Sequence, residues 1–295
     1  MTGEAAPPAV QDRRAGVLGS PIRHSLSPAL HRAAYGALGL AWDYRAYQVD
    51  EGGLASFLHG LDQSWAGLSL TMPLKRAVIP LLDEVSPLGV SVEAVNTVLF
   101  DRGAGPRGGP GEVRRRGENT DVPGMVAALR ERGVAGVTSA AVLGGGATAA
   151  SAVAAVREVC AGEITVYVRG AERVAEMHRV AERLERAVRI ASWHMAAGAL
   201  RAELVVSTTP AGATDDLAPG LGPGPGVLFD VVYDPWPTRL AAGWTAAGGV
   251  VVSGLDLLVH QAVLQVELMT GITPAPLAVM RAAGERELAA RAAPA

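Results

Sequence analysis

Lysine is almost absent from this chain, which carries it at Lys75 alone. The other 25 of its 26 Lys and Arg residues are arginine. An arginine guanidinium, with a pKa above about 12, keeps its proton near neutral pH, whereas a lysine ammonium can be tuned to release one. The single lysine is therefore a candidate for proton transfer, and an ordinary solvated lysine is the alternative.

Cysteine is equally scarce. Cys160 is the only one, which excludes an intramolecular disulfide and fits a reducing compartment. Its apolar, helix-like neighbours predict a buried thiol rather than a nucleophile. Residues 1–10 lack a basic flank leading into an apolar core, so we expect no signal peptide, and no run of about 18 apolar residues predicts a membrane span. These features predict a cytoplasmic protein.

Excess positive charge is also missing, since the net charge is −3. The one basic run, Arg114–Arg116, is typical of a solvated strand, so nucleic acid is not an expected partner. The six histidines show no ligand-like spacing, and we expect no metal. They are His24, His31, His59, His178, His194 and His260.

Short apolar stretches alternate with helical ones along all 295 residues, which predicts an α/β fold with mainly parallel sheets and two domains. The expected strands are Gly16–Gly19, Trp42–Val49, Gly67–Thr71, Val95–Phe100, Ser139–Leu143, Ile164–Val168, Leu204–Ser207, Val227–Val232 and Val250–Ser253. The expected helices include Pro28–Leu38, Glu51–Leu61, Val122–Arg132, Ala147–Cys160, Ala171–Ala187 and Leu255–Met269.

We place the domain boundary near Asp121, because a new strand–glycine–helix unit begins soon afterwards. Residues 122–252 would form one domain. Residues 1–121 and the final helices, 253–295, would form the other. The Gly/Pro-rich segments Arg102–Gly111 and Pro219–Gly226 are expected to be loops, the first of them a hairpin.

The segment Ser69–Lys75 reads as a strand end that turns through Pro73 into a helix. Polar residues at the carboxyl ends of strands are where α/β proteins place their sites. Lys75 therefore stands where a functional residue is expected.

A glycine-rich turn joins the expected strand ending at Leu143 to the next helix. Gly144 and Gly146 fit the first two glycines of a dinucleotide fingerprint, and Ala149 takes the small third position. Such a turn brings the backbone and a helix N-terminus close to a pyrophosphate. A turn required only for packing is the alternative.

The strand after that turn ends in Arg169, with Arg173 one helical turn further on. A site for NAD usually has an acidic residue here, to bind the ribose hydroxyls. Two guanidiniums instead suit the 2′-phosphate of NADP. Either one alone could be a surface charge, because arginine is the default cation of this chain.

Ser27 precedes Pro28 at the start of an expected helix and is a good candidate for its N-cap. Capping does not explain Ser25, and two hydroxyls beside free helix amides would make a small carboxylate pocket. Asn96 could be a turn residue and Asp121 an N-cap, so each is ambiguous by itself.

Together these segments resemble the shikimate dehydrogenase family, whose members reduce 3-dehydroshikimate with NADPH. The resemblance runs from Gly19 to Gln261 with the motifs in the family's order. In the first part of the chain, the similar segments are the carboxylate-binding Ser25–Pro28, the catalytic-lysine segment Thr71–Lys75 and the substrate-binding Ala94–Thr97. Asn119–Asp121 is similar to the catalytic-aspartate segment. Asp230–Tyr233 and Gly254–Gln261 are similar to the late segments that complete the nicotinamide and substrate pockets.

The resemblance implies an NADP-dependent oxidoreductase of aromatic amino acid biosynthesis in which Lys75 exchanges a proton and Asp121 orients it. It implies that substrate is bound by Ser25, Ser27, Thr71, Asn96, Tyr233 and Gln261. It implies that residues 122–252 are a Rossmann-like NADP-binding domain and that residues 1–121 with 253–295 are the substrate domain. It implies that NADP is bound by Gly144, Gly145, Gly146, Ala147, Thr148, Arg169, Arg173, Val231 and Gly254. The implied small-molecule partners are shikimate and 3-dehydroshikimate. A homodimer is a further expectation.

Some positions depart from the family pattern. Ser69 stands where asparagine is frequent, and Asp256 replaces a common glycine beside the nicotinamide pocket. Val168 and Gly170 flank Arg169 in place of the usual Asn and Ser or Thr, which removes two polar contacts near the adenosine phosphate. None of these changes removes a catalytic group.

Two other functions stay open. One is a quinate or quinate/shikimate dehydrogenase that uses NAD. The paired serines, Ser25 and Ser27, favour shikimate over quinate as the substrate. The other is a dinucleotide-binding regulator without turnover. An intact Lys75 and Asp121 argue against a regulator, since a sensor need not keep an acid–base pair.

Overall fold

The computed structural model describes residues 13–102 and 113–292, which contain two six-stranded sheets. The first sheet is made of β1 (Arg14–Gly19), β2 (Asp43–Gln48), β3 (Trp65–Leu70), β4 (Glu84–Val85), β5 (Thr97–Arg102) and β6 (Val113–Glu118). The second is made of β7 (Val137–Leu143), β8 (Cys160–Val168), β9 (Arg189–Ser192), β10 (Leu204–Ser207), β11 (Val227–Asp230) and β12 (Val250–Val252).

Helices connect and cover these strands. The α-helices are α1 (Ser27–Ala37), α2 (Glu51–His59), α3 (Leu74–Ala77), α4 (Pro87–Val92), α5 (Asp121–Glu131), α6 (Ala147–Val159), α7 (Ala171–Arg183), α8 (Arg239–Ala246), α9 (Gly254–Thr270) and α10 (Leu277–Ala292). Short 3-10 helices are η1 (Ile79–Leu81), η2 (Trp193–Arg201) and η3 (Asp215–Gly220).

The strand orders confirm the predicted α/β class. The first sheet runs β2-β1-β3-β5-β6-β4, and β5 is antiparallel to both of its neighbours while the remaining pairs are parallel. The second sheet runs β12-β11-β10-β7-β8-β9 and is parallel at every pairing. Strands covered on both faces are mostly apolar, and all six residues of β3 are buried, with Ser69 the one polar side chain among them.

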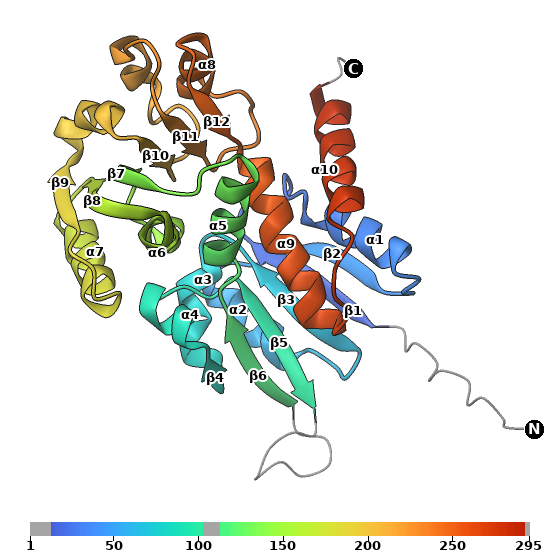
Figure 1. Ribbon diagram of the computed structural model, residues 1–295. Helices are drawn as coiled ribbons and strands as arrows, with labels where there is room; N and C mark the ends of the chain where they lie inside the picture. Colours follow the sequence, from blue (N-terminus) through green and yellow to red (C-terminus); the bar gives the residue numbers. More distant parts are fainter. Residues whose placement is uncertain (1–12, 103–112, 293–295) are drawn as a thin grey trace, which may run out of the picture.

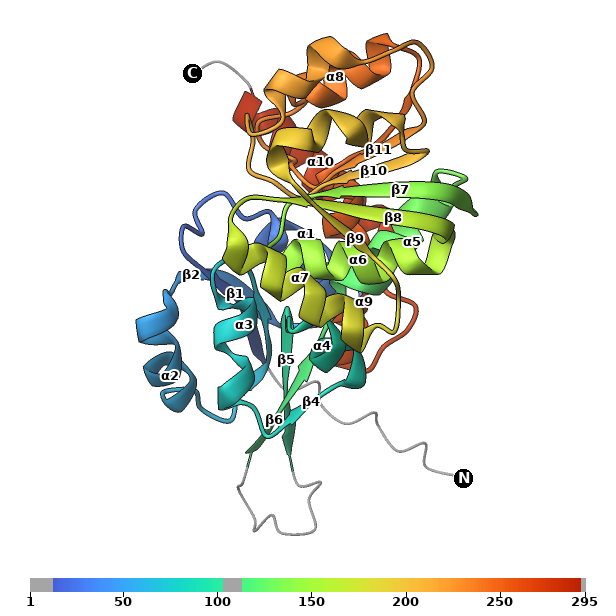
Figure 2. The same cartoon turned by 90° about the vertical axis from the view of Figure 1, so that its left-hand side faces the viewer.

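The two sheets form two lobes joined through α5 and α9, as Figures 1 and 2 show. The last helices, α9 and α10, pack against α1 and therefore against the first sheet, although β7 to β12 precede them in the chain. Helix α5 contacts both α9 and α6 and so lies between the lobes.

Small side chains let the helices of this junction approach closely. Helix α6 has the sequence ATAASAVAAVREV and is buried from Ala149 to Val156. At the crossing of α5 and α9, a Cβ added at Gly124 would lie 2.9 Å from the backbone nitrogen of Gln261. Glycine at this position therefore allows α5 and α9 to approach this closely.

Ser27 and Asp121, the two candidate N-caps, do not cap their helices. Helix α1 begins at Ser27 itself, because Leu26 already has helical angles, and Ser25 Oγ accepts from the Ser27 amide at 3.3 Å. Helix α5 begins at Asp121, and Asn119 Oδ1 accepts from the Val122 amide at 3.1 Å. In both places a neighbour satisfies the helix amides, so the side chains of Ser27 and Asp121 remain free for other contacts.

Cys160 begins β8 rather than ending the preceding helix, because it pairs with Val137 across the sheet, and it is buried as predicted. The expected hairpin connects β5 and β6, whose pairing is antiparallel, but nearly all of its loop lies outside the described residues. Residues 1–10, where no signal peptide is expected, also lie outside them.

In the part of the chain that the structure describes, no helix has both the length and the apolar character needed to cross a lipid bilayer.

Candidate active site

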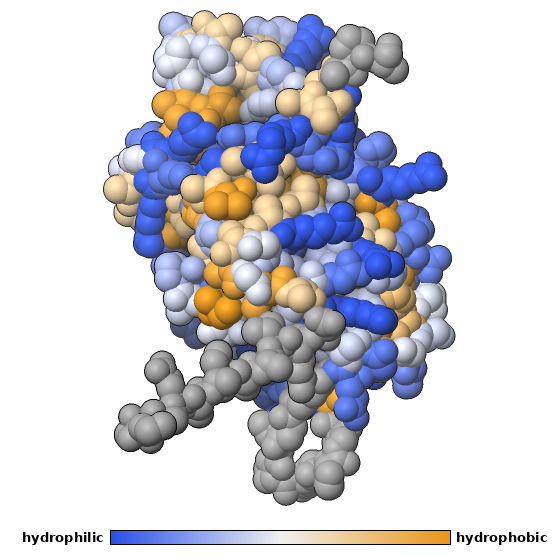
Figure 3. Space-filling view, turned by 90° about the vertical axis from the view of Figure 1, so that its right-hand side faces the viewer, coloured by the Kyte–Doolittle hydropathy of each residue, from blue (hydrophilic) through white to orange (hydrophobic). Residues whose placement is uncertain are grey.

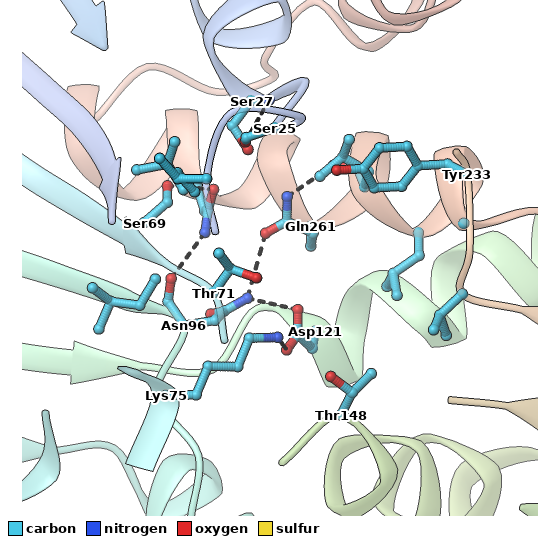
Figure 4. A pocket seen from close by; sticks show the side chains of 18 of the residues that line it. Ser25, Ser27, Ser69, Thr71, Lys75, Asn96, Asp121, Thr148, Tyr233 and Gln261 are labelled. Atoms are coloured by element: carbon cyan, nitrogen blue, oxygen red, sulfur yellow. Dashed lines mark hydrogen bonds and ion pairs between the residues drawn. The ribbon is translucent and has the colours of Figure 1, made fainter. Parts of the chain in front are cut away.

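A cavity of about 340 Å³ lies between the lobes, where the carboxyl ends of β1 and β3 meet α5, α6 and α9. Figure 4 shows its polar side chains pointing toward one another from these elements. Eleven of the expected site residues line it: Ser25, Ser27, Thr71, Lys75, Asn96, Asp121, Thr148, Val231, Tyr233, Gly254 and Gln261.

Lys75 and Asp121 form an ion pair inside this cavity. Nζ of Lys75 lies 2.6 Å from Oδ2 of Asp121, and the two side chains are 13% and 5% exposed. Lys75 stands on α3, directly after the turn that ends β3, and Asp121 opens α5. Because both groups are shielded from water, their attraction is screened far less than that of a surface pair.

Asn96 connects the pair to the rest of the pocket. Its Nδ2 donates to Oδ1 of Asp121 at 2.8 Å and to Oγ1 of Thr120 at 2.9 Å, and lies 3.4 Å from Oε1 of Gln261. Its Oδ1 accepts from the Thr120 amide at 2.8 Å. These bonds orient Asp121 so that each carboxylate oxygen has its own donor, one from Asn96 and one from Lys75.

The opposite wall carries hydroxyl groups. Ser25 and Ser27 lie at the start of α1, and the Tyr233 hydroxyl donates to the carbonyl of His24 at 3.3 Å. Burial raises the pKa of Tyr233, so this hydroxyl keeps its proton at neutral pH. The wall thus offers neutral donors and no carboxylate, which suits an anionic group of a ligand.

Ser69 and Gln265 also line the cavity, and they are hydrogen-bonded to each other and to buried neighbours. Ser69 Oγ accepts from the Tyr44 hydroxyl at 2.7 Å and donates to Gln265 Oε1 at 2.8 Å. Gln265 Nε2 in turn donates to Thr97 Oγ1 at 3.0 Å and to the Asn96 carbonyl at 3.2 Å. The serine that departs from the family pattern therefore has its own buried partners.

Neither Gln265 nor Tyr44 is among the site residues expected from the sequence. Gln265 follows Gln261 by four residues on α9, a spacing that puts two helical side chains on one face and could have identified it. Tyr44 gives no such signal, because only the tertiary fold brings β2 beside Ser69.

His31 stacks on the ring of Tyr44 with centroids 3.9 Å apart. Complete burial lowers the pKa of His31 to about 4, outweighing its hydrogen bond to the Ser27 carbonyl. A neutral imidazole therefore supports Ser27, which lines the pocket.

The glycine-rich turn has the backbone that a dinucleotide site requires. Gly144 has φ +123°, and a Cβ there would lie 2.3 Å from Oγ1 of Thr208. Gly146 is the N-cap of α6 with no side-chain cap, and a Cβ there would meet nothing within 4 Å. Space is therefore open beside the start of α6, as a pyrophosphate site needs.

The remaining expected cofactor residues surround this turn rather than the cavity. Gly145 and Ala147 belong to the turn and the start of α6. Arg173 lies on α7, with its Cβ 2.9 Å from a Cβ added at Gly145. The Arg169 guanidinium lies 4.4 Å from the ring centroid of Trp193.

Asp256 does not line the cavity, contrary to its expected place beside the nicotinamide pocket. Its carboxylate accepts from Ser253, caps the start of α9, and forms ion pairs with Arg281 and Arg132. Burial alone would raise the pKa of Asp256, but these bonds and charges lower it. Because Asp256 is only 2% exposed, it needs such partners, and they point it away from the pocket.

Among residues 13–102 and 113–292, no cluster of three or more His, Cys, Asp or Glu side chains could hold a metal ion.

Family models match two parts of the chain. Residues 17–98 match the shikimate dehydrogenase substrate binding domain, and residues 254–283 match the shikimate 5′-dehydrogenase C-terminal domain. A shikimate dehydrogenase (NADP(+)) from Carboxydothermus hydrogenoformans is 31% identical over 285 residues, which cover 91% of this chain and 95% of the relative.

Solved structures of shikimate dehydrogenases are also similar to this chain. Shikimate dehydrogenase of Mycobacterium tuberculosis is 39% identical with a TM-score of 0.82, over 93% of this chain and 99% of that one. The Thermus thermophilus shikimate 5-dehydrogenase, solved with NADP(H) and shikimate, is 34% identical with a TM-score of 0.78, again over 93% and 99%. On these similarities, the chain belongs to the shikimate dehydrogenase family.

Proposed function

We propose that this protein is an NADP-dependent shikimate dehydrogenase, which reversibly reduces 3-dehydroshikimate to shikimate. The buried pair of Lys75 and Asp121 is the observation that carries the proposal, because it puts the chain's one lysine in a pocket lined by hydroxyl and amide groups. The reaction would serve the synthesis of chorismate and aromatic amino acids.

Lys75 supplies the proton of the reaction. Negative charge develops on the C3 oxygen of the substrate as the carbonyl is reduced, and a donor placed there stabilises it. The Lys75 ammonium gives its proton to that oxygen, and in the reverse direction the amine removes the proton of the C3 hydroxyl.

Asp121 orients Lys75 and holds its positive charge through the 2.6 Å ion pair. Asn96 keeps the carboxylate in place from the other side. Thr71, Asn96 and Gln261 bind the ring hydroxyls, and Ser25, Ser27 and Tyr233 bind the carboxylate. Fixing both ends of a small ring positions C3, and such positioning can lower a barrier by several kcal/mol.

The residues of the second lobe fit a dinucleotide. The open N-terminus of α6 and Gly144 to Thr148 would hold its pyrophosphate, Arg169 and Arg173 its 2′-phosphate, and Val231 and Gly254 its nicotinamide ring. NADP, when bound, supplies or accepts the hydride. A Cβ at Gly254 would lie 2.1 Å from the Val231 carbonyl oxygen, so the chain is too close there for any side chain.

The activity is tested by following absorbance of the reduced nicotinamide with shikimate or quinate crossed against NADP or NAD. We expect the fastest reaction with shikimate and NADP. A preference for quinate with NAD would make the protein a quinate dehydrogenase instead, and cofactor binding without turnover on any pair would make it a regulator.

We further propose two domains, residues 1–121 with 253–295 and residues 122–252. The packing of α9 and α10 on α1 supports this division. A cytoplasmic location follows from the proposed metabolic role, and the single cysteine fits its reducing conditions.

We also propose a homodimer. Figure 3 shows hydrophobic groups broken up by hydrophilic ones on the face toward α10 and α1. Leu268, Ile272 and Val279 are large apolar side chains that stay exposed near the end of α9 and the start of α10. Light scattering coupled to gel filtration measures the mass, and a monomer at micromolar concentration would contradict the proposal.

A further inference from the structure

Glu176 of α7 is held by two arginines that come from different lobes. Its Oε2 lies 2.7 Å from Nη1 of Arg173, on the same helix, and 2.8 Å from Nη1 of Arg76, next to Lys75 on α3. Figure 2 shows α7 below the second sheet, beside α3 and α4 of the first lobe. One carboxylate oxygen therefore bridges the two lobes.

The carboxylate is buried and charged. The Glu176 side chain is only 10% exposed. Burial alone would raise the pKa of Glu176, but hydrogen bonds and charges from Arg76 and Arg173 lower it. A buried carboxylate that lost both partners would be strongly unfavourable, so at least one arginine must stay with it.

Arg173 is also one of the two arginines expected to bind the 2′-phosphate of NADP, and it lies against the glycine-rich turn. Arg169, the other, lies over the ring of Trp193 and forms no ion pair with a described residue. Of the two guanidiniums, Arg173 is thus the one already engaged by an anion of the protein itself.

We propose that Glu176 sets cofactor selectivity by competing with the 2′-phosphate of NADP for Arg173. NAD lacks that phosphate and is unaffected, so Glu176 lowers the preference for NADP over NAD. This inference rests on the proposed function, because it concerns the cofactor of that reaction.

Arg76 determines how easily Glu176 releases Arg173. When a phosphate takes Arg173, Glu176 keeps its 2.8 Å pair with Arg76 and is not left as an unpaired buried charge. Nε and Nη2 of Arg76 are buried without a hydrogen-bond partner, so Arg76 has donors to spare for the carboxylate. Removing Arg76 would leave Glu176 with Arg173 alone and strengthen the competition.

The two variants are therefore expected to change selectivity in opposite directions. Glu176→Gln should lower KM and Kd for NADP about fivefold and leave those for NAD unchanged, while Arg76→Met should raise the NADP values about threefold. Steady-state shikimate oxidation gives the KM values, and fluorescence titration with NADPH and NADH gives Kd. A purely structural role would move both cofactors together.

Glu93→Gln is the matched control. Glu93 follows α4 and pairs with Arg183 of α7 at 2.7 Å, so it also joins α7 to the first lobe, but it does not touch Arg173. It should leave the ratio of the NADP and NAD constants unchanged.

The inference is overturned if Glu176→Gln leaves that ratio unchanged or weakens NADP, or if Glu93→Gln changes it equally. A wild-type protein that oxidises shikimate with neither cofactor would refute the proposed function instead, and NADPH and NADH titrations would still test the competition.

Discussion

At the scale of single residues, Asn96 connects more of the pocket's polar groups than any other described side chain. It bonds to Asp121 and Thr120 and approaches Gln261. Its backbone carbonyl accepts from Gln265. An amide can do this because it carries donors and acceptors together, whereas a carboxylate or an ammonium offers only one kind.

Lys75 gives the sharpest test at this scale. Lys75→Met removes the proton donor but keeps a side chain of similar length, so kcat should fall about a thousandfold while shikimate affinity changes little. Steady-state rates and calorimetric binding of shikimate measure the two effects separately.

Lys75→Arg serves as the companion variant. It keeps a positive charge beside Asp121 but holds its proton at neutral pH, so it should be nearly as inactive. Near-normal turnover in either variant would remove Lys75 from the mechanism.

His31 gives a prediction about pH. Its folded pKa of about 4 lies below the unfolded value of about 6.5, so protons bind preferentially to the unfolded chain between these values. The stability from neutral His31 is complete above about pH 6.5 and is lost as the pH falls toward 4, by at most about 3.4 kcal/mol.

Urea unfolding at pH 7.5 and pH 5 measures this loss. The loss should be smaller in His31→Phe, which keeps a ring against Tyr44 and cannot titrate. An equal loss in the variant and the wild type would rule out His31 as its source.

At the scale of elements, Asp256 joins the start of α9 to α10 and to the end of α5. It caps α9 with Ser253 and pairs with Arg281 and Arg132. Asp256→Asn should lower the free energy of unfolding by about 3 kcal/mol, because two guanidiniums lose a buried charge. The residual enzyme should keep its kcat, since Asp256 does not line the pocket.

Glu287→Gln is the control for this change. Glu287 pairs with Arg291 on the exposed surface of α10, so the variant should cost less than about 0.5 kcal/mol. Equal melting temperatures for the Asp256 and Glu287 variants would show that the buried ion pairs of Asp256 do not stabilise α9.

At the scale of the whole molecule, Gly254 lies where the chain leaves the second sheet and enters α9. A Cβ there would meet the Val231 carbonyl oxygen at 2.1 Å, so Gly254→Ala must push the end of β11 away from α9. We expect a loss of about 2 kcal/mol and a marked fall in activity, because the lobes meet at this point.

Gly36→Ala in α1 is the comparison, since a Cβ there meets nothing within 4 Å. It should be neutral or stabilise the helix by about 0.5–1 kcal/mol. Thermal unfolding and shikimate oxidation of both variants measure the difference. A Gly254→Ala variant that behaves like Gly36→Ala would show that the close approach has no consequence.

The sequence by itself determined the α/β class and most of its elements. Alternating apolar stretches identify β1, β3, β7, β8 and β10 because these strands are buried on both faces. Short or weakly patterned elements were not predicted: β4 has only two residues, and α8 has eight residues with Gly243 among them. Such elements form because the surrounding fold holds them, which no local pattern records.

The sequence also pointed to Lys75, through its rarity and its place after a strand. Only the tertiary structure decided which neighbours these residues have. It turned Asp256 away from the pocket, brought Tyr44 to Ser69, and paired Glu176 of α7 with Arg76 across the lobes. These contacts join elements far apart in the chain, so they depend on how helices and sheets pack, whereas spacing and composition report only on residues near one another.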